Sequence, residues 1–394
     1  MSTRLSTEEV TAWIRLSLEP DLGPAQARNL LAAVGLPQDI YALSSSALQK
    51  YLPADMARQL KAAAPADVQD TIAKTLDWLQ DPRHHLLTLA DPAYPPVLLD
   101  IHDPPLVLYA NGNLDALQRP ALAIVGARSA TPAGTDNALA FAKHLAAQGW
   151  CIISGLALGI DTAAHEGALL AGGAGATIAV MGTGMDIVYP ARNRLLAHQI
   201  AEHGLLLSEF PLGTRALPWQ FPKRNRIVAG LSKGVLVVEA ARQSGSLITA
   251  RMASDMGREV FAIPGSIHSP LSRGCHALIR QGAKLVESAQ DISDELGLPI
   301  GVVKTPLLAP QSATPPLSAP SLKQPQTSAP ISDAPGYATL MTALGHDPVD
   351  ADTLRQRTNL DTGALQALLL QLELANHITQ LPDGRYQRRL PQLI

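Results

Sequence analysis

Seven short apolar runs separated by helical stretches lie between Ala121 and Glu287, and this alternation limits the fold more than any other feature. Hydrophobic residues occupy both alternating sets of positions, as expected for parallel strands covered by helices on both faces. The sequence therefore predicts an α/β fold over residues 121–300, with a Rossmann-like, doubly wound, mostly parallel sheet. Ligands of such sheets bind beyond the carboxyl ends of the strands. The predicted strands are residues 122–126, 151–154, 177–181, 205–209, 235–238, 260–263 and 285–287.

Different patterns flank this predicted sheet. Apolar residues at helical spacing predict a small N-terminal helical domain over residues 1–80, SAM-like or helix-hairpin-helix-like. Prolines in residues 81–120 predict an extended lead-in instead of a helix. Residues 301–335 are rich in Pro, Ser and Ala, which predicts a disordered linker. Three helical patterns and an Asp383-Gly384 hairpin turn predict a winged-helix-like domain over residues 336–394.

Two of these segments suggest nucleic-acid contacts and leave alternatives open. The stretch from Leu22 to Leu31 resembles the turn of helix-hairpin-helix modules, which touch the DNA backbone through amides; a plain turn between packed helices has the same pattern. The third helix of the winged-helix-like domain carries no Lys or Arg, which argues against major-groove reading. Protein contacts are an equal alternative for that domain.

The overall charge and the cysteines narrow the class of protein. The formal net charge is -3, so any nucleic-acid site must be a local basic patch. The only two cysteines, Cys151 and Cys275, are not at metal-ligand spacing and do not suggest a disulfide framework. We find neither a secretory signal nor an apolar stretch of membrane-spanning length, which predicts a cytoplasmic protein without membrane contact.

The run from Ser154 to Asp161 follows a predicted strand and opens a helix at Ile160. Main-chain N–H groups at such a helix start attract anions. Glycines let the main chain approach a ligand, and serine adds a hydroxyl. We therefore predict a phosphate-binding loop, although a tight strand-to-helix turn without a ligand is the alternative. Its contact residues would be Ser154, Gly155, Leu156, Ala157 and Gly159.

Three further groups of residues are expected at the same sheet edge. Arg128 follows the first predicted strand of the sheet. A cluster of cations precedes an apolar helical run, where the helix dipole disfavours positive charge unless an anion is bound. The alternative is a solvated turn that pairs with Glu209 or Glu239. A serine-rich turn then offers hydroxyls and amides, or caps its helix. The cation cluster and the turn comprise Lys223, Arg224, Asn225, Arg226, Ser244, Gly245 and Ser246.

Signs of catalysis are weak. The glycines do not form a G-x-G-x-x-G pattern, which disfavours a dinucleotide cofactor, and nucleophile-elbow and zincin motifs are missing. Asp161 and His165 lie four residues apart, but a third metal ligand cannot be identified. We therefore expect a protein that is not an enzyme and that uses no metal or cofactor.

The motifs IVGARS, SGLALGIDTAAHEGAL, MGTGMDIVYPARN, FPKRNRIVAGLS and VVEAARQSGSLITA resemble the DprA/Smf family, over about Pro92 to Leu296. The resemblance implies a non-catalytic single-stranded DNA-binding protein that protects incoming DNA and loads the RecA recombinase during natural transformation. It also implies a homodimer, with His276, Ile279 and Leu285 at the interface. The alternative is a Rossmann-like, phosphoribohydrolase-like enzyme acting on nucleotides or phosphorylated small molecules, although the P-G-G-x-G-T-x-x-E signature is not found. Phe210 and Phe221 are the evident candidates for base stacking.

Overall fold

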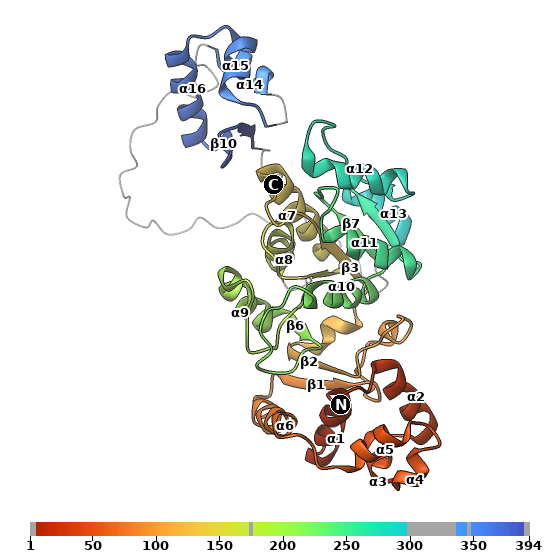
Figure 1. The fold of residues 1–394 in the computed structure, drawn as a ribbon. Coiled ribbons are helices and arrows are strands. Elements are labelled where there is room, and N and C mark those ends of the chain that lie inside the picture. The colour runs from red at the N-terminus through yellow and green to blue at the C-terminus, as the bar shows by residue number, and fades with distance from the viewer. Residues whose placement is uncertain (1–4, 173–175, 298–335, 345–347, 390–394) are drawn as a thin grey trace, which may run out of the picture. The chain divides into compact units, whose positions relative to one another are not determined.

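The computed structural model describes residues 5–172, 176–297, 336–344 and 348–389 (Figure 1). Contacts divide the chain into two units: residues 1–130 with 137–299, and residues 300–394 with 131–136. The predicted linker at 301–335 lies outside the described residues. The units are described separately below.

A nine-stranded sheet forms the centre of the first unit, in the order β1-β2-β6-β5-β4-β3-β7-β8-β9. The seven strands from β3 onward pair in parallel, whereas β1 pairs antiparallel with β2 and β2 with β6. The predicted Rossmann-like, mostly parallel fold is therefore confirmed. The strands are β1 His84–Thr88, β2 Val107–Gly112, β3 Ala121–Val125, β4 Cys151–Ser154, β5 Ala176–Val180, β6 Leu205–Ser208, β7 Gly234–Val237, β8 Glu259–Ala262 and β9 Lys284–Leu285.

The strand order places a topological switch point between β3 and β7. After β3 the chain adds β4, β5 and β6 on one side, and then returns past β3 to add β7, β8 and β9 on the other. The loops that leave β3 and β7 therefore diverge, and the crevice between them is where open α/β sheets bind ligands.

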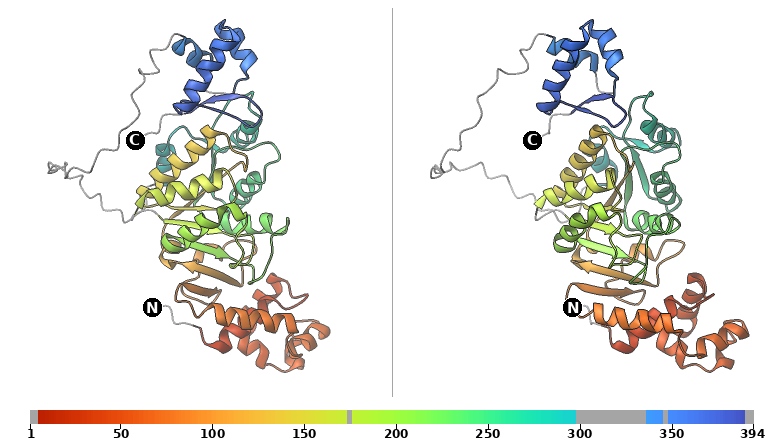
Figure 2. Two further views of the ribbon diagram at one scale, coloured as in Figure 1. Left: turned by 90° about the vertical axis from the view of Figure 1, so that its left-hand side faces the viewer. Right: turned by 60° about the vertical axis from the view of Figure 1, so that its left-hand side comes forward.

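Helices cover both faces of this sheet (Figure 2). Strand β3 shows why: Ala121, Ala123 and Val125 pack into one buried cluster, and Leu122 and Ile124 into another. Because alternate side chains of a strand point to opposite faces, an apolar strand needs cover on both. One face packs against α10 Gln220–Leu231, α11 Ser246–Asp255 and α12 Arg273–Arg280; the other packs against α7 Pro132–Ala147, α8 Ile160–Leu170, α9 Arg194–His203 and α13 Ala289–Leu296.

Residues 81–120 contribute more to the sheet than the sequence analysis predicted. They form β1 and β2, joined through the short 3-10 helix η1 Pro96–Leu98 and followed by η2 Leu114–Gln118. The prolines at 95, 96, 104 and 105 all lie between the two strands, where no ladder N–H is required. They mark a loop between strands, so reading the whole segment as one extended lead-in missed the pair.

The N-terminal residues form the predicted small helical domain. Ser6 and Glu9 make a reciprocal capping box at the first helix. Leu16, Leu30 and Ile40 belong to its buried core. The helices are α1 Thr7–Ser17, α2 Pro24–Val34, α3 Pro37–Ala42, α4 Ser45–Leu48, α5 Ala54–Lys61 and α6 Ala66–Trp78. The turn expected to resemble a helix-hairpin-helix module joins α1 to α2, and its contact with DNA stays a prediction.

The described residues 336–344 and 348–389 of the second unit form three helices and a hairpin, as predicted. They are α14 Tyr337–Leu344, α15 Ala351–Thr358 and α16 Thr362–Leu374, followed by β10 Ile378–Gln380 and β11 Tyr386–Arg388. Gly384 has a φ of 82° in the hairpin turn, which suits glycine. Leu354, Leu365 and Leu372 are buried in the core, whereas Leu370 and Leu374 on α16 are exposed.

Candidate functional site

A cleft of about 530 Å³ opens at the carboxyl ends of β3, β4 and β7, at the switch point of the sheet. It is lined by the loop after β3, the loop after β4, the start of α10 and the start of α11. The structure thus brings together eight of the predicted site residues: Arg128, Gly155, Ala157, Arg224, Asn225, Ser244, Gly245 and Ser246.

Two residues of the loop after β4 cannot act as predicted. Ser154 is fully buried, and its hydroxyl donates a hydrogen bond of 2.6 Å to the carbonyl oxygen of Ile124. Leu156 is also fully buried. The hydroxyl of Ser154 therefore holds two strands together and is not available to a ligand.

The glycines of this loop make room for other parts of the protein. A Cβ on Gly155 would collide with the guanidinium of Arg224. Gly159 has a φ of 78°, and a Cβ there would collide with the carbonyl of Ala127. These positions require glycine for internal packing, so the predicted reason for them, close approach of a ligand, does not hold.

The anion at this loop is a side chain of the protein itself. Oδ2 of Asp161 accepts hydrogen bonds from the N–H groups of Gly155 at 3.1 Å and Ala157 at 3.3 Å. The prediction that these amides are free is therefore wrong. Asp161 stands in the first turn of α8, where the helix dipole also favours a carboxylate. Burial raises the pKa of Asp161, and nearby Arg224 opposes that rise.

Arg224 supports the same loop from below. Its guanidinium donates to the carbonyl oxygens of Gly155 and Val180. Burial lowers its pKa to about 10, against the effect of Asp161. The side chain is buried and its donors are occupied, so Arg224 orders the cleft floor. The prediction that it binds a phosphate directly is therefore wrong.

His165 lies beneath this floor. It is fully buried, with Nδ1 2.7 Å from Oγ1 of Thr177, and burial lowers its pKa to about 3. In the described residues no group of three His, Cys, Asp or Glu side chains is arranged to hold a metal ion. Asp161 and His165 are thus engaged in packing and hydrogen bonds within the protein.

The groups that face the open cleft come from three segments. Arg128 is exposed, and its guanidinium carbon lies 5.7 Å from the ring centre of Phe221. Asn225 is half-buried on α10. The start of α11 contributes Ser244, whose hydroxyl lies 2.7 Å from that of Ser246. An exposed guanidinium beside a helix N-terminus gives this part of the cleft a positive potential.

Lys223 and Arg226, the other two cations of α10, point to Glu209 and not into the cleft. Nζ of Lys223 lies 3.7 Å from Glu209, and Arg226 pairs with Glu209 and, at 3.5 Å, with Asp103. Burial raises the pKa of Glu209, and both cations oppose this. The alternative interpretation, pairing with Glu209, is confirmed for Lys223 and Arg226. They line a separate small cavity and not the cleft.

Sequence reasoning missed one residue that shapes the cleft. Asn193 is buried, and its side-chain amide donates to the carbonyl oxygen of Leu156 and to Oγ1 of Thr162, both at 2.9 Å. It fastens the loop after β4 to α8. The contact spans 37 residues of sequence, so no local pattern could have indicated it.

The residues expected at a dimer interface lie near the β9 edge of the sheet. Nε2 of His276 lies 2.9 Å from the carbonyl oxygen of Gly265. Ile279 is partly buried against the main core. Leu285 is 48% exposed on β9. Their role in dimerisation stays a prediction.

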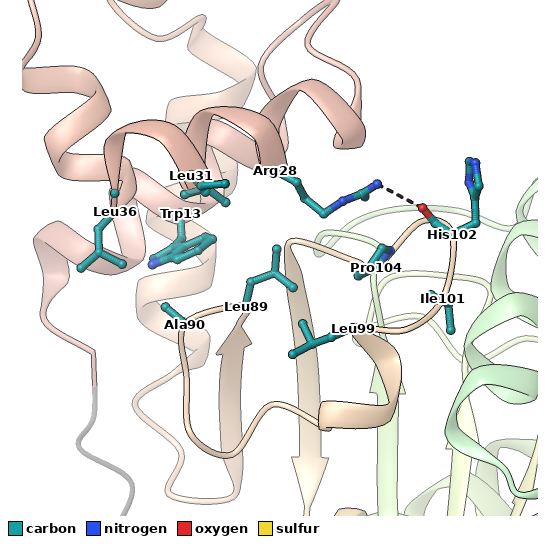
Figure 3. A pocket seen from close by; sticks show the side chains of 12 residues that line it. Trp13, Arg28, Leu31, Leu36, Leu89, Ala90, Leu99, Ile101, His102 and Pro104 are labelled. Atoms are coloured by element: carbon teal, nitrogen blue, oxygen red, sulfur yellow. Dashed lines mark hydrogen bonds between the residues drawn. The ribbon is translucent and has the colours of Figure 1, made fainter. Parts of the chain in front are cut away.

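A second cavity, of about 440 Å³, lies between α1–α3 and the loop at 89–104 (Figure 3). Trp13, Leu31 and Leu99 make its lining mostly apolar. The Arg28 guanidinium is occupied, because it donates to the carbonyl oxygen of His102 at 3.1 Å and pairs with Asp103 at 3.0 Å. This cavity lacks the converging polar groups that make the first cleft the better candidate.

The sheet, its switch-point cleft and the second unit define a Rossmann-like protein joined to a winged-helix domain. The chain belongs to the DprA/Smf family, because residues 85–297 match the model for DNA recombination-mediator protein A and residues 324–384 match the DprA winged helix domain.

Relatives agree with this assignment. Protein Smf of Escherichia coli strain K12 is 41% identical over 320 residues, which cover 81% of each chain. DNA processing protein DprA of Streptococcus pneumoniae is 49% identical over 208 residues, covering 53% of this chain and 73% of that protein. The X-ray structure of DprA from Streptococcus pneumoniae has a TM-score of 0.59 and 38% identity, covering 74% of this chain and 99% of that one. Among the described helices, none is both long and apolar enough to span a membrane.

Proposed function

We propose that this protein binds single-stranded DNA along the switch-point cleft without reading its sequence. The observation that carries the proposal is the exposed guanidinium of Arg128 beside the start of α11, above a floor fixed by Asp161 and Arg224. Guanidinium groups and helix N-termini both bind phosphate, and phosphate contacts contain no sequence information. Of the predicted contacts, Arg128, Asn225, Ser244, Gly245 and Ser246 would meet the strand.

Family membership supports a proposal for the cellular role. The matched model is described as a DNA recombination mediator, and relatives in Streptococcus pneumoniae and Bacillus subtilis are named DNA processing proteins. We infer that the chain protects incoming DNA in the cytoplasm and loads the RecA recombinase on it during natural transformation. The test is the rate at which RecA forms filaments on DNA that is already coated with a separate, general single-strand-binding protein. Adding the chain should increase this rate.

The proposal assigns no bond-breaking step to the cleft. Asp161 and His165, which could otherwise act as acid or base, are bound within the protein. Incubation with nucleoside monophosphates should therefore release no free base. Base release would support the phosphoribohydrolase-like alternative.

Binding at two salt concentrations tests the cleft directly. Arg128→Ala should weaken binding to oligo-dT about tenfold, because a charge-assisted hydrogen bond is lost. The slope of log affinity against log salt should also fall by about 0.7, the value for one phosphate contact on a single strand. Arg58→Ala, which removes an exposed arginine paired with Asp55 on α5, is the matched control. Equal affinities and equal salt slopes for the two variants would contradict the assignment of Arg128 to phosphate binding.

We further propose that the edge at β9 joins two copies of the chain. Leu285 is exposed there, and His276 and Ile279 lie on neighbouring α12. Leu285→Arg should convert a dimer to a monomer in light-scattering measurements. An unchanged mass would place the contact elsewhere.

A further inference from the structure

Exposed aromatic side chains are rare in this protein. In the part of the chain that the structure describes, only Tyr51, Tyr189 and Trp219 are exposed among the aromatic residues. Aromatics make up 4% of the sequence, and most of the described ones are buried or partly buried. Two of the three exposed rings, those of Tyr189 and Trp219, are linked to the start of α10, where the helix borders the cleft.

Tyr189 extends a row of neighbouring side chains outward from the cleft. Phe221 lines the cleft, with Arg128 over its ring. The ring centre of Tyr189 lies 5.5 Å from that of Phe221, and Tyr189 is 51% exposed. A Cβ on Gly182 would lie 2.9 Å from the Phe221 ring, so glycine at 182 makes room for it. The row therefore runs from a cation in the cleft to a ring open to solvent.

Trp219 is held in a similar way, two residues before Phe221. Its ring meets buried Phe210 edge to face, with 6.1 Å between ring centres, and Lys223 lies 5.6 Å from the Phe210 ring. Trp219 nevertheless remains 57% exposed. An apolar face of this ring is therefore open to a ligand. Trp219 stands at the N-cap of α10, next in sequence to Pro218 and two residues before Phe221, both of which line the cleft.

We propose that Tyr189, which contacts Phe221 of the cleft, and Trp219, two residues before Phe221, form a stacking platform for unpaired nucleobases. The inference rests on the proposed function, because it assigns the bases of the same strand whose phosphates bind at Arg128. Every base has a π-face, so stacking tolerates any sequence. Bases of a duplex are already stacked on one another, and the platform therefore favours single strands over duplex.

Abasic DNA separates base contacts from phosphate contacts. We would measure binding of oligo-dT and of an abasic oligonucleotide of equal length to the full chain and to Tyr189→Ala and Trp219→Ala. Each variant should lose about 5- to 100-fold in affinity for oligo-dT and keep its affinity for the abasic strand. Tyr51→Ala, which removes an equally exposed tyrosine from the helical domain, should match the unaltered chain on both ligands. Unchanged oligo-dT binding, or equal losses on both ligands, would overturn the proposal.

Two further measurements keep the outcomes distinct. Arg128→Ala should weaken both ligands; if it does so while the aromatic variants bind normally, the cleft proposal stands and the platform is refuted. If Arg128→Ala changes the affinity for neither ligand, the proposed function itself fails.

Oligo-dT should also quench the tryptophan fluorescence of the unaltered chain, and Trp219→Leu should remove this quenching. Trp219→Phe should restore most of the affinity, because it retains a ring.

Discussion

The switch-point cleft lies where open α/β sheets bind ligands, and helix α16 is the third helix of a fold whose relatives bind DNA through a helix. In the cleft, the exposed Arg128 and the start of α11 favour an anion. On α16, Leu370 and Leu374 are exposed instead, and no lysine or arginine occurs between 362 and 374. The comparison shows that a fold fixes where a site can lie, whereas the side chains decide what it can bind.

The two regions also differ in what lies beneath them. The cleft floor contains the buried charged groups Asp161 and Arg224, which hydrogen-bond to the main chain, and His165 lies beneath it, bonded to Thr177. The buried side of helix α16 consists of leucines, among them Leu365 and Leu372, which pack into an apolar core. Changes under the cleft should therefore cost far more stability than changes on α16.

The largest effect is expected from Arg224→Met. This change removes the donors to the carbonyl oxygens of Gly155 and Val180 and the buried charge near Asp161, which costs about 3–5 kcal/mol of unfolding free energy. Urea unfolding of the full chain measures it. Arg355→Met, at an exposed arginine on α15, should change stability by less than about 0.5 kcal/mol. Similar stabilities for the two variants would show that the cleft floor does not depend on Arg224.

A change of pH should have a smaller effect on the free energy of unfolding. Since burial lowers the pKa of His165 to about 3, the unfolded chain binds a proton below about pH 6.5 that the folded chain does not. Stability should therefore fall as pH falls, by about 2 kcal/mol from this residue between pH 7 and pH 5. Asp161, whose pKa is raised, acts in the opposite direction.

Comparison with His165→Gln isolates the histidine. The difference in unfolding free energy between this variant and the unaltered chain should shrink or change sign as pH falls from 7 to 5. A difference independent of pH would mean that His165 is not held neutral by burial.

The smallest effect should come from α16. Changing Leu370 and Leu374 together to glutamate should alter oligo-dT affinity by less than about twofold, because added surface charge outside the cleft is screened by salt. Duplex binding measured in parallel would sharpen the comparison. A tenfold loss on either ligand would show that α16 takes part in DNA binding after all.

Much of the fold could be predicted, because the parallel strands are apolar on both faces and the winged-helix turn carries Asp383-Gly384. The location of the cleft was also predictable, since carboxyl ends of parallel strands share one edge. The roles of individual residues were not. Arg224 reaches Gly155 across 69 residues of sequence, and Asp161 takes the amides expected for a ligand. Such contacts depend on tertiary packing and leave no local pattern.

The carboxylate of Asp161 has one more consequence. Because it already satisfies the amides of Gly155 and Ala157, the turn after β4 needs no ligand to hold its shape. A strand bound in the cleft as proposed would meet a rim that is formed beforehand. Such a rim would let the strand shift by one nucleotide without refolding a loop at each step.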